Sequence, residues 1–176
     1  MSSIASAGTP AQIAGRCSVQ PVVYDGLFPE LCPVLEQIIL GRMQHDRSRR
    51  TGSINVGGWK SGEDFFQWPD QEVQQLRQAI GLMAGSSSLV AWAMVNRAGS
   101  YHPRHQHRIA ALTGIYYVTA GSQEAITPTI FECPDGEMAV DPCPGRLAIF
   151  RGEMWHRVSV YSGELPRITV AFDVRR

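Results

Sequence analysis

Residues 89–118 read LVAWAMVNRAGSYHPRHQHRIAALTGIYYV, and this stretch decides the fold that we expect. It begins and ends with apolar runs rich in β-branched and aromatic residues, and a polar segment with three histidines separates them. Runs of this kind, bounded by Gly, Pro and Ser, are typical of β-strands. Further apolar runs follow at 126–131, 147–150, 157–161 and 168–174, with turns rich in Pro, Gly and Asp between them. The sequence therefore predicts a β core over residues 89–175.

The chain before this core has a different pattern. After a short strand at 22–24, apolar residues recur at helical spacing over 29–41 and again over 70–83. Gly41 is expected to stop the first helix, and Asp70 is positioned to cap the second. Between the helices, the segment GGWKS at 57–61 is expected to be irregular. Helices first and short strands afterwards predict an α+β, mainly β chain whose N-terminal helices pack on a sandwich or barrel.

Length and composition are those of one globular domain. The 176 residues are 44% hydrophobic and 18% charged, which is enough for a sizeable core. We assign residues 21–176 to this domain and residues 1–20, rich in Ala, Ser and Gly, to a flexible tail. The 4 cysteines form no C-x-x-C pair, so we expect reduced thiols rather than a zinc knot. A bridge between Cys133 and Cys143 is the alternative.

The charge and hydropathy of the chain exclude several kinds of partner. There are 16 basic and 16 acidic residues, and the resulting net charge of zero argues against nucleic acid and anionic membranes. No apolar run approaches the roughly 20 residues that a membrane-spanning helix needs. With no basic start followed by an apolar stretch, we expect no secretory signal and a cytoplasmic protein that acts on a small molecule. A homodimer is the default expectation for its assembly.

Four of the 5 histidines gather in two short segments. His105 and His107 are two residues apart, a spacing that places both side chains on one face of a strand. Imidazole is the commonest metal ligand near neutral pH, and His156 in a later apolar strand could complete a set of three. The alternative is a pair of surface histidines, because H-x-H alone is a weak motif. His102 precedes Pro103 and is expected to lie off the strand, beside the metal or in solvent.

Arg167 offers a permanent planar cation that can bind a carboxylate through two hydrogen bonds. Its orientation depends on the loop before it. If residues 162–165 form a four-residue hairpin loop, Val160 pairs with Arg167. Arg167 and Thr169 then share the face of His156, whereas a five-residue loop turns Arg167 away.

Together these segments resemble the small bacterial 2-oxoglutarate/Fe(II) oxygenases. In that family an H-x-H motif is soon followed by a segment like S-G-V-Y-Y, and later by a histidine and then an arginine with a hydroxyl residue. The matching segments of this chain are 91–107, 112–118, 145–150, 156–158 and 167–172, preceded by the G-G-W-x-S element at 57–61. The likeness spans roughly residues 57–174 and rests on the motifs jointly.

The resemblance implies a double-stranded β-helix, a jelly-roll or cupin-like core that holds iron in its mouth. The residues implied for Fe(II) are His105, His107 and His156. Those implied for 2-oxoglutarate are Arg167, Thr169, Asn96, Tyr117 and Tyr116. Those implied for a substrate pocket are Arg108, Trp59 and His102. Because neighbours in a strand alternate, only one of the two tyrosines can face the histidines.

The implied reaction uses O2 to oxidise an unactivated C–H bond of a small metabolite or amino-acid-like biosynthetic intermediate, most often by hydroxylation, with release of succinate and CO2. The chemistry is at the metal, so no protein acid or base is implied. The chain departs from the pattern at three places. The wider superfamily prefers H-x-D or H-x-E where His107 stands, and relatives often have proline at Arg108 and serine at Thr113.

Two other functions are open on this evidence. A three-histidine cupin-type dioxygenase would share the histidines but would need neither Arg167 nor 2-oxoglutarate. A non-catalytic β-sandwich binding module would use the histidines for metal-linked stability or for nothing.

Overall fold

The computed structural model of the protein describes residues 20–46 and 54–175. The expected tail, residues 1–20, lies outside this part of the chain except for Gln20. The assignment of residues 21–176 to one domain stays a prediction.

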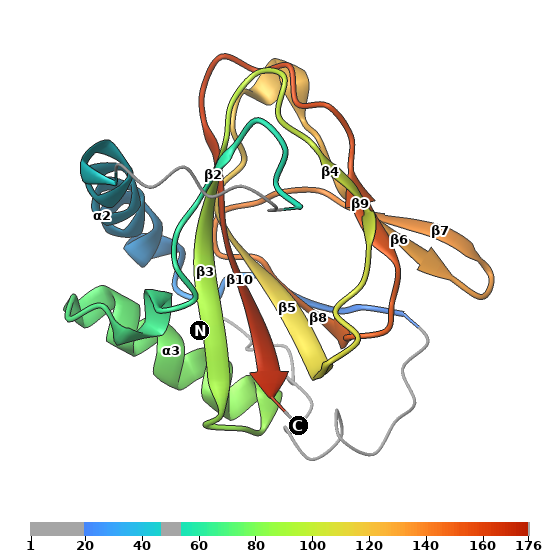
Figure 1. Ribbon diagram of the computed structural model, residues 1–176, viewed down its shortest axis with the longest axis horizontal. Coiled ribbons are helices and arrows are strands. Elements are labelled where there is room, and N and C mark those ends of the chain that lie inside the picture. Colours follow the sequence, from blue (N-terminus) through green and yellow to red (C-terminus); the bar gives the residue numbers. More distant parts are fainter. Residues whose placement is uncertain (1–19, 47–53, 176) are drawn as a thin grey trace, which may run out of the picture.

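Ten strands in this part of the chain form two antiparallel sheets (Figure 1). The larger sheet has the order β1-β8-β5-β10-β3-β2 and the smaller one the order β4-β9-β6-β7. The strands of the larger sheet are β1 (Val22–Tyr24), β2 (Trp59–Lys60), β3 (Leu89–Asn96), β5 (Ala110–Thr119), β8 (Leu147–Arg151) and β10 (Arg167–Arg175). Those of the smaller sheet are β4 (His102–His105), β6 (Thr129–Cys133), β7 (Gly136–Val140) and β9 (His156–Val158). The predicted α+β, mainly β class is confirmed.

Two α-helices, α2 (Cys32–His45) and α3 (Gln71–Ala84), lie against one face of the larger sheet, and the smaller sheet lies on its other side (Figure 1). Short 3-10 turns lie at Pro29–Leu31, Phe65–Gln67 and Gln123–Ala125. The helices bury one apolar side against the sheet because their apolar residues recur at helical spacing. The main core cluster therefore lies between the helices and the sheet, and includes Leu35, Ile39, Leu76 and Ile80.

Both predicted helices are present, but the expected stop of the first one is wrong. Helix α2 continues through Gly41 and ends at His45. Met43 packs against the core beyond the glycine, and this burial outweighs the roughly 1 kcal/mol that glycine costs in a helix. Asp70 stands at the N-cap position of α3 as expected, although its side chain makes no capping hydrogen bond.

Successive side chains of β10 point alternately to the two faces of the larger sheet. Ile168, Val170 and Phe172 point to the helix side and belong to the main core cluster. The intervening residues of β10 therefore point toward the smaller sheet. These intervening residues are Arg167, Thr169, Ala171 and Asp173, and they line the space between the two sheets from one end to the other.

The hairpin expected between His156 and Arg167 is wrong. Strand β9 pairs with β4 and β6 in the smaller sheet, whereas β10 pairs with β3 and β5 in the larger one. The segment between them crosses from one sheet to the other, and Val160 is 61% exposed rather than paired with Arg167. His156 and Arg167 still face a common interior, because the two sheets turn their inner faces toward each other.

Smaller differences concern the ends of strands. Strand β7 was not expected, the strand expected from 126 begins at Thr129, and the strand expected to reach 161 ends at Val158. The GGWKS segment contains the two-residue strand β2, which pairs with β3. The described cysteines Cys32, Cys133 and Cys143 are free, so the alternative bridge is wrong, and Cys17 lies outside the described residues. No helix in the described part of the chain has the length and apolar character needed to cross a membrane.

Candidate metal centre

The three expected histidines come together between the sheets. One ligand atom from each of His105, His107 and His156 lies within 4.8 Å of the others. His105 at the end of β4 and His156 at the start of β9 are cross-strand partners, and their ring centroids are 4.1 Å apart. The His107 ring lies 5.4 Å from each of the other two. This arrangement can hold one metal ion.

His107 reaches the cluster by a different route from the one expected. Strand β4 ends at His105, so strand alternation does not place the two histidines on one face. Instead the chain turns, and the backbone N–H of His107 donates to the carbonyl of Gly152 at 2.6 Å. A β-carbon at Gly152 would collide with the carbonyl oxygens of His107 and Ala110. Only glycine fits at this contact.

Each ring has a hydrogen-bond acceptor at its Nδ1. His105 Nδ1 lies 2.7 Å from the Pro103 carbonyl, and His156 Nδ1 lies 3.0 Å from the Met154 carbonyl. His107 Nδ1 lies 2.9 Å from a carboxylate oxygen of Asp173. An acceptor at Nδ1 fixes the proton there and leaves the Nε2 lone pair for a metal. All three histidines are therefore prepared as Nε2 ligands.

Burial keeps two of these rings neutral. It lowers the pKa of His156 to about 3, with a further contribution from His105. Burial also lowers the pKa of His105. A neutral imidazole is the form that binds metal, and nitrogen donors suit Fe, Zn, Cu and Ni. The three imidazoles fit a first-row divalent ion with positions left open for small molecules.

A second feature of the interior is a buried cation. Arg167 is 1% exposed, and its Nη2 donates to Thr129 Oγ1 at 3.2 Å. Among residues 20–46 and 54–175, its Nε has no hydrogen-bond partner, and neither does the buried Oγ1 of Thr169. No carboxylate in the described part of the chain forms an ion pair with this guanidinium, and burial lowers the pKa of Arg167. Because an unpaired buried charge costs several kcal/mol, the site is suited to an acidic ligand.

The two tyrosines alternate as expected, and Tyr117 is the one that faces the interior. Its ring lies 5.5 Å from the Arg167 guanidinium, and its hydroxyl donates to Thr129 Oγ1 at 2.8 Å. Tyr116 points to the helix side, where its hydroxyl donates to the Leu27 carbonyl at 2.8 Å. Tyr116 as a cosubstrate residue is therefore wrong. Thr129 had not been expected in the site, because nothing near it in the sequence marks it.

His102 lies in the strand, contrary to expectation. It begins β4 opposite Val158, is buried, and lines the cavity beside the three histidines. Its Nε2 lies 3.0 Å from Asn55 Oδ1 and 3.2 Å from Asn96 Nδ2. Burial, and next the charge of Arg167, lower the pKa of His102 to about 3, so this ring is neutral too. Asn96 Oδ1 is buried without a partner, as are the orphaned groups near Arg167.

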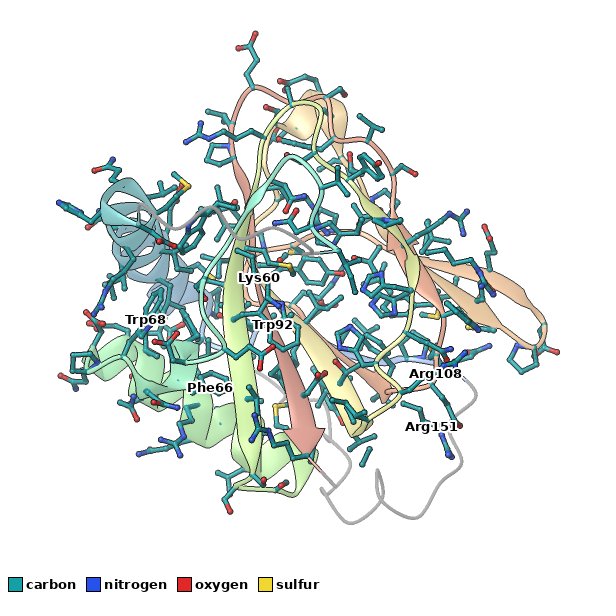
Figure 2. All side chains as sticks on the ribbon, in the orientation of Figure 1. Lys60, Phe66, Trp68, Trp92, Arg108 and Arg151 are labelled. Atoms are coloured by element: carbon teal, nitrogen blue, oxygen red, sulfur yellow. The ribbon has the colours of Figure 1, made fainter. Side chains whose placement is uncertain are left out.

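The histidines open into a cavity of about 290 Å³. Its apolar wall is formed by Trp92, Met94, Ile115, Phe150 and Ala171. Arg108, expected in the substrate pocket, lines this cavity, and Figure 2 shows it across the space between the sheets from Trp92. Arg167 and Thr169 do not line this cavity. They share the inner face of β10 with Ala171, which does line it.

Trp59 as a substrate-pocket residue is wrong. It pairs with Val95, which faces the helix side, and its Nε1 donates to Asp46 Oδ2 at 3.0 Å. The next residue, Lys60, points to the cavity instead, with Nζ 4.4 Å from the centre of the Trp92 ring. The two-residue strand β2 sets these opposite directions.

No protein-family model matches this sequence, and a comparison with curated proteins finds no similar one. Solved structures with the same fold exist. A prolyl-4-hydroxylase from Pseudomonas putida superposes with a TM-score of 0.78 at 17% identity, covering 96% of this chain and 97% of that one. A prolyl hydroxylase from Trichoplax adhaerens, in complex with a hypoxia inducible factor peptide, gives 0.73 at 13%, covering 95% and 87%.

A third solved structure is that of the epimerase SnoN in complex with Fe3+, alpha ketoglutarate and nogalamycin RO. It superposes with a TM-score of 0.71 at 13% identity, covering 93% of this chain and 83% of that one. These likenesses confirm the expected double-stranded β-helix core with N-terminal helices packed on it. At such identities they establish the fold, and the residues of this chain must carry the argument on function.

Proposed function

We propose that the protein is a non-haem Fe(II)/2-oxoglutarate-dependent dioxygenase. It hydroxylates an unactivated C–H bond of a small metabolite or amino-acid-like biosynthetic intermediate and releases succinate and CO2. One observation carries the proposal: the interior between the sheets combines three convergent imidazoles with a buried arginine that has no carboxylate partner among the described residues. An enzyme of this fold that was solved with Fe3+ and alpha ketoglutarate supports the same interpretation.

The three histidines hold the metal in this proposal. Each Nδ1 has an acceptor within the protein, so each Nε2 is left to bind Fe(II). The iron, when bound together with 2-oxoglutarate and O2, supplies the oxidising chemistry. Three protein ligands leave positions open for small molecules, as in the non-haem Fe(II) oxygenases that use three side chains.

Arg167 holds the carboxylate of 2-oxoglutarate that is distant from the metal. Its Nε and the hydroxyl of Thr169 lack partners, and the two residues share one face of β10. A carboxylate between them accepts hydrogen bonds from both and removes the cost of the unpaired cation. Thr129 on β6 accepts a hydrogen bond from the guanidinium, and the ring of Tyr117 on β5 lies beside it, so both residues hold it in place. Asn96 at the end of β3 and His102 at the start of β4 form a neutral polar cluster between the two sheets.

The cavity restricts what the enzyme can oxidise. Its apolar wall excludes water, which protects a reactive oxidant from wasteful side reactions. The volume of about 290 Å³ suits a small molecule. Arg108 and Lys60 add positive charge to the lining, and Glu63 and Asp173 add negative charge. The substrate is therefore expected to carry polar groups around an apolar body.

A three-histidine cupin-type dioxygenase is the second candidate, because the ligand cluster found among the described residues includes no carboxylate. Such an enzyme uses the same metal centre but has no use for a cosubstrate carboxylate. It therefore leaves the unpaired guanidinium of Arg167 and the orphaned hydroxyl of Thr169 unexplained. These two groups favour the 2-oxoglutarate enzyme.

The test is an anaerobic titration of the Fe(II)-loaded protein with 2-oxoglutarate, followed by the visible charge-transfer absorption of a bidentate 2-oxo acid on ferrous iron. We expect the band in the wild type, its loss in His156→Ala, and a large rise in the 2-oxoglutarate concentration required in Arg167→Met. Arg157→Ala is the matched control, since this arginine is exposed and pairs with Glu137. It should behave as wild type.

The other outcomes separate the candidates. Metal binding without a band at any 2-oxoglutarate concentration contradicts the proposal and favours the cupin-type enzyme. A protein that binds no divalent metal is neither enzyme, and the binding-module interpretation then stands.

A further inference from the structure

Asp173 is placed to act on the metal centre without touching the metal. It lies on the inner face of β10, and its two carboxylate oxygens are 2.9 Å and 3.2 Å from His107 Nδ1. Both side chains are mostly buried, with 16% exposure for Asp173 and 13% for His107. In so protected a place, a charge-assisted hydrogen bond is stronger than at the surface.

Regular sheet geometry fixes the carboxylate. Asp173 and Thr113 are cross-strand partners on β10 and β5. The Thr113 hydroxyl lies 2.6 Å from Asp173 Oδ1 and 2.8 Å from the carbonyl of Phe172. Because Thr113 is almost fully buried, its β-branched side chain is held in one orientation. The carboxylate is therefore aimed at the imidazole by a rigid neighbour.

Trp92 also restricts the orientation of the His107 ring. The two rings are stacked, with centroids 5.8 Å apart and an interplanar angle of 7°. Trp92 sets the plane of the imidazole, and Asp173 sets its rotation within that plane. Together they direct Nε2 toward His105 and His156.

Asp173 is not itself a ligand in this arrangement. It faces Nδ1, and in an imidazole the Nδ1–H and the Nε2 lone pair point away from each other on opposite sides of the ring. The group of atoms close enough to share one ion consists of the three histidine nitrogens. The carboxylate therefore lies one imidazole away from the metal position.

The three Nδ1 acceptors are not equivalent. His105 and His156 donate to neutral backbone carbonyls, whereas His107 donates to a carboxylate. Three neutral imidazoles leave a divalent ion with its full charge of +2, whereas a set of two imidazoles and one carboxylate reduces it to +1. A carboxylate hydrogen-bonded to a ligand imidazole makes that nitrogen a stronger donor. His107 is thus the ligand that carries negative charge to the ion.

We propose that Asp173 is a positioning residue that supplies, through His107, the negative charge that this metal centre lacks among its ligands. It raises the affinity of the site for a divalent metal and favours the ferric over the ferrous state. The inference rests on the proposed function, because it needs the three histidines to bind metal.

The test uses Co(II) as the probe, titrated into the metal-free full-length protein in competition with a chromophoric chelator. Asp173→Asn removes the charge and keeps the size and a hydrogen-bond acceptor. We expect its Co(II) affinity to fall about 10- to 100-fold. Asp135→Asn, at the exposed turn between β6 and β7, is the matched control and should bind as tightly as wild type.

A second measurement distinguishes an effect of the charge of Asp173 from an effect of its size. The reduction potential of iron bound to the protein should rise in Asp173→Asn relative to wild type, because less negative charge stabilises the ferric state. A side chain that only fills space leaves the potential of the bound iron unchanged. Thr113→Val, which keeps the charge but removes the hydroxyl that aims it, should lose part of the Co(II) affinity, and Thr113→Ser should recover it.

Three outcomes overturn the inference. In the first, the wild type binds Co(II) and His107→Ala does not, but Asp173→Asn has the Co(II) affinity and the iron reduction potential of the wild type. The metal site is then real, and Asp173 has no role in it. If the wild type binds no Co(II), the metal site fails and the inference fails with it. If Asp173→Asn does not fold, the two Thr113 variants provide the test. Equal Co(II) affinity in Thr113→Val, Thr113→Ser and wild type then shows that Asp173 has no role at the metal site.

Discussion

His105 and His156 are cross-strand partners on β4 and β9, and their ring centroids lie 4.1 Å apart. Burial lowers the pKa of each of the two rings. Two imidazoles held this closely repel each other when protonated, and each directs a lone pair to the same point when neutral. Paired strands therefore fix the positions of these two ligands, whereas the third ligand, His107, lies in the turn after β4.

Metal binding should stabilise the fold, and His156→Ala should abolish the effect. A ligand that binds only the folded state at 100 times its dissociation constant adds about 2.7 kcal/mol to the free energy of unfolding. The measurement is the thermal unfolding of the metal-free protein with and without Co(II). His45→Ala, which removes an exposed histidine at the end of α2, is the control and should keep the full shift. A Co(II)-dependent shift that survives in His156→Ala would place the metal elsewhere.

The metal-free protein should lose stability as the pH falls from 7 to 5. His102 and His156 have pKa values of about 3 in the folded state, far below the 6.5 of an unfolded chain. Below pH 6.5 the unfolded state therefore binds more protons, and each of these histidines lowers the free energy of unfolding by up to about 1.4 kcal/mol per pH unit. The stability is fully present above pH 6.5 and is lost progressively toward pH 3.

Urea unfolding at pH 7, 6 and 5 measures this slope. This range lies above the region where the carboxylates of Asp25, Glu132 and Glu137 titrate, because arginine partners lower their pKa values. A free energy of unfolding that does not change between pH 7 and 5 would contradict the burial of these two histidines as neutral groups.

Much of the site could be predicted because its signals are local. Two-residue alternation within β10 predicts that Arg167 and Thr169 share a face, whichever strands lie beside them. The residue type of His105, His107 and His156 indicates a ligand set, although the strand alternation expected to bring His105 and His107 together does not extend to His107.

The parts that could not be predicted depend on pairing between distant strands. Thr129 contacts Arg167 because β6 faces β10, and Asp173 reaches His107 across 66 positions of sequence. The face taken by Trp59 depends on the register of a two-residue strand against β3. Sequence proximity predicts a β9–β10 hairpin, but β9 lies in the smaller sheet and β10 in the larger one.

Arg167→Met should separate ligand binding from folding. The guanidinium is buried and has no carboxylate partner in the part of the chain that the structure describes. Replacing it with an apolar side chain of similar length removes the cost of the unpaired charge, so the metal-free protein should be at least as stable as wild type. The same change removes the partner of the cosubstrate carboxylate, so 2-oxoglutarate should no longer raise the melting temperature of the Fe(II)-loaded protein. Anaerobic thermal unfolding measures both quantities. A severe loss of stability without 2-oxoglutarate would show that Arg167 is a structural residue.

Gly152→Ala should weaken metal binding although Gly152 is not a ligand. A β-carbon at this position collides with the carbonyl oxygens of His107 and Ala110, so the turn that carries His107 has to move. A displacement of this kind pulls Nε2 away from the other two nitrogens, and we expect the Co(II) affinity to fall at least 10-fold, as it does when the support of a ligand is lost. Gly41→Ala is the matched control, because open space surrounds Gly41 within α2. It should leave Co(II) affinity unchanged and raise the free energy of unfolding by about 0.5–1 kcal/mol, since alanine favours the helix. Unchanged Co(II) affinity in Gly152→Ala, measured by the same chelator competition, would mean that the position of His107 does not depend on this contact.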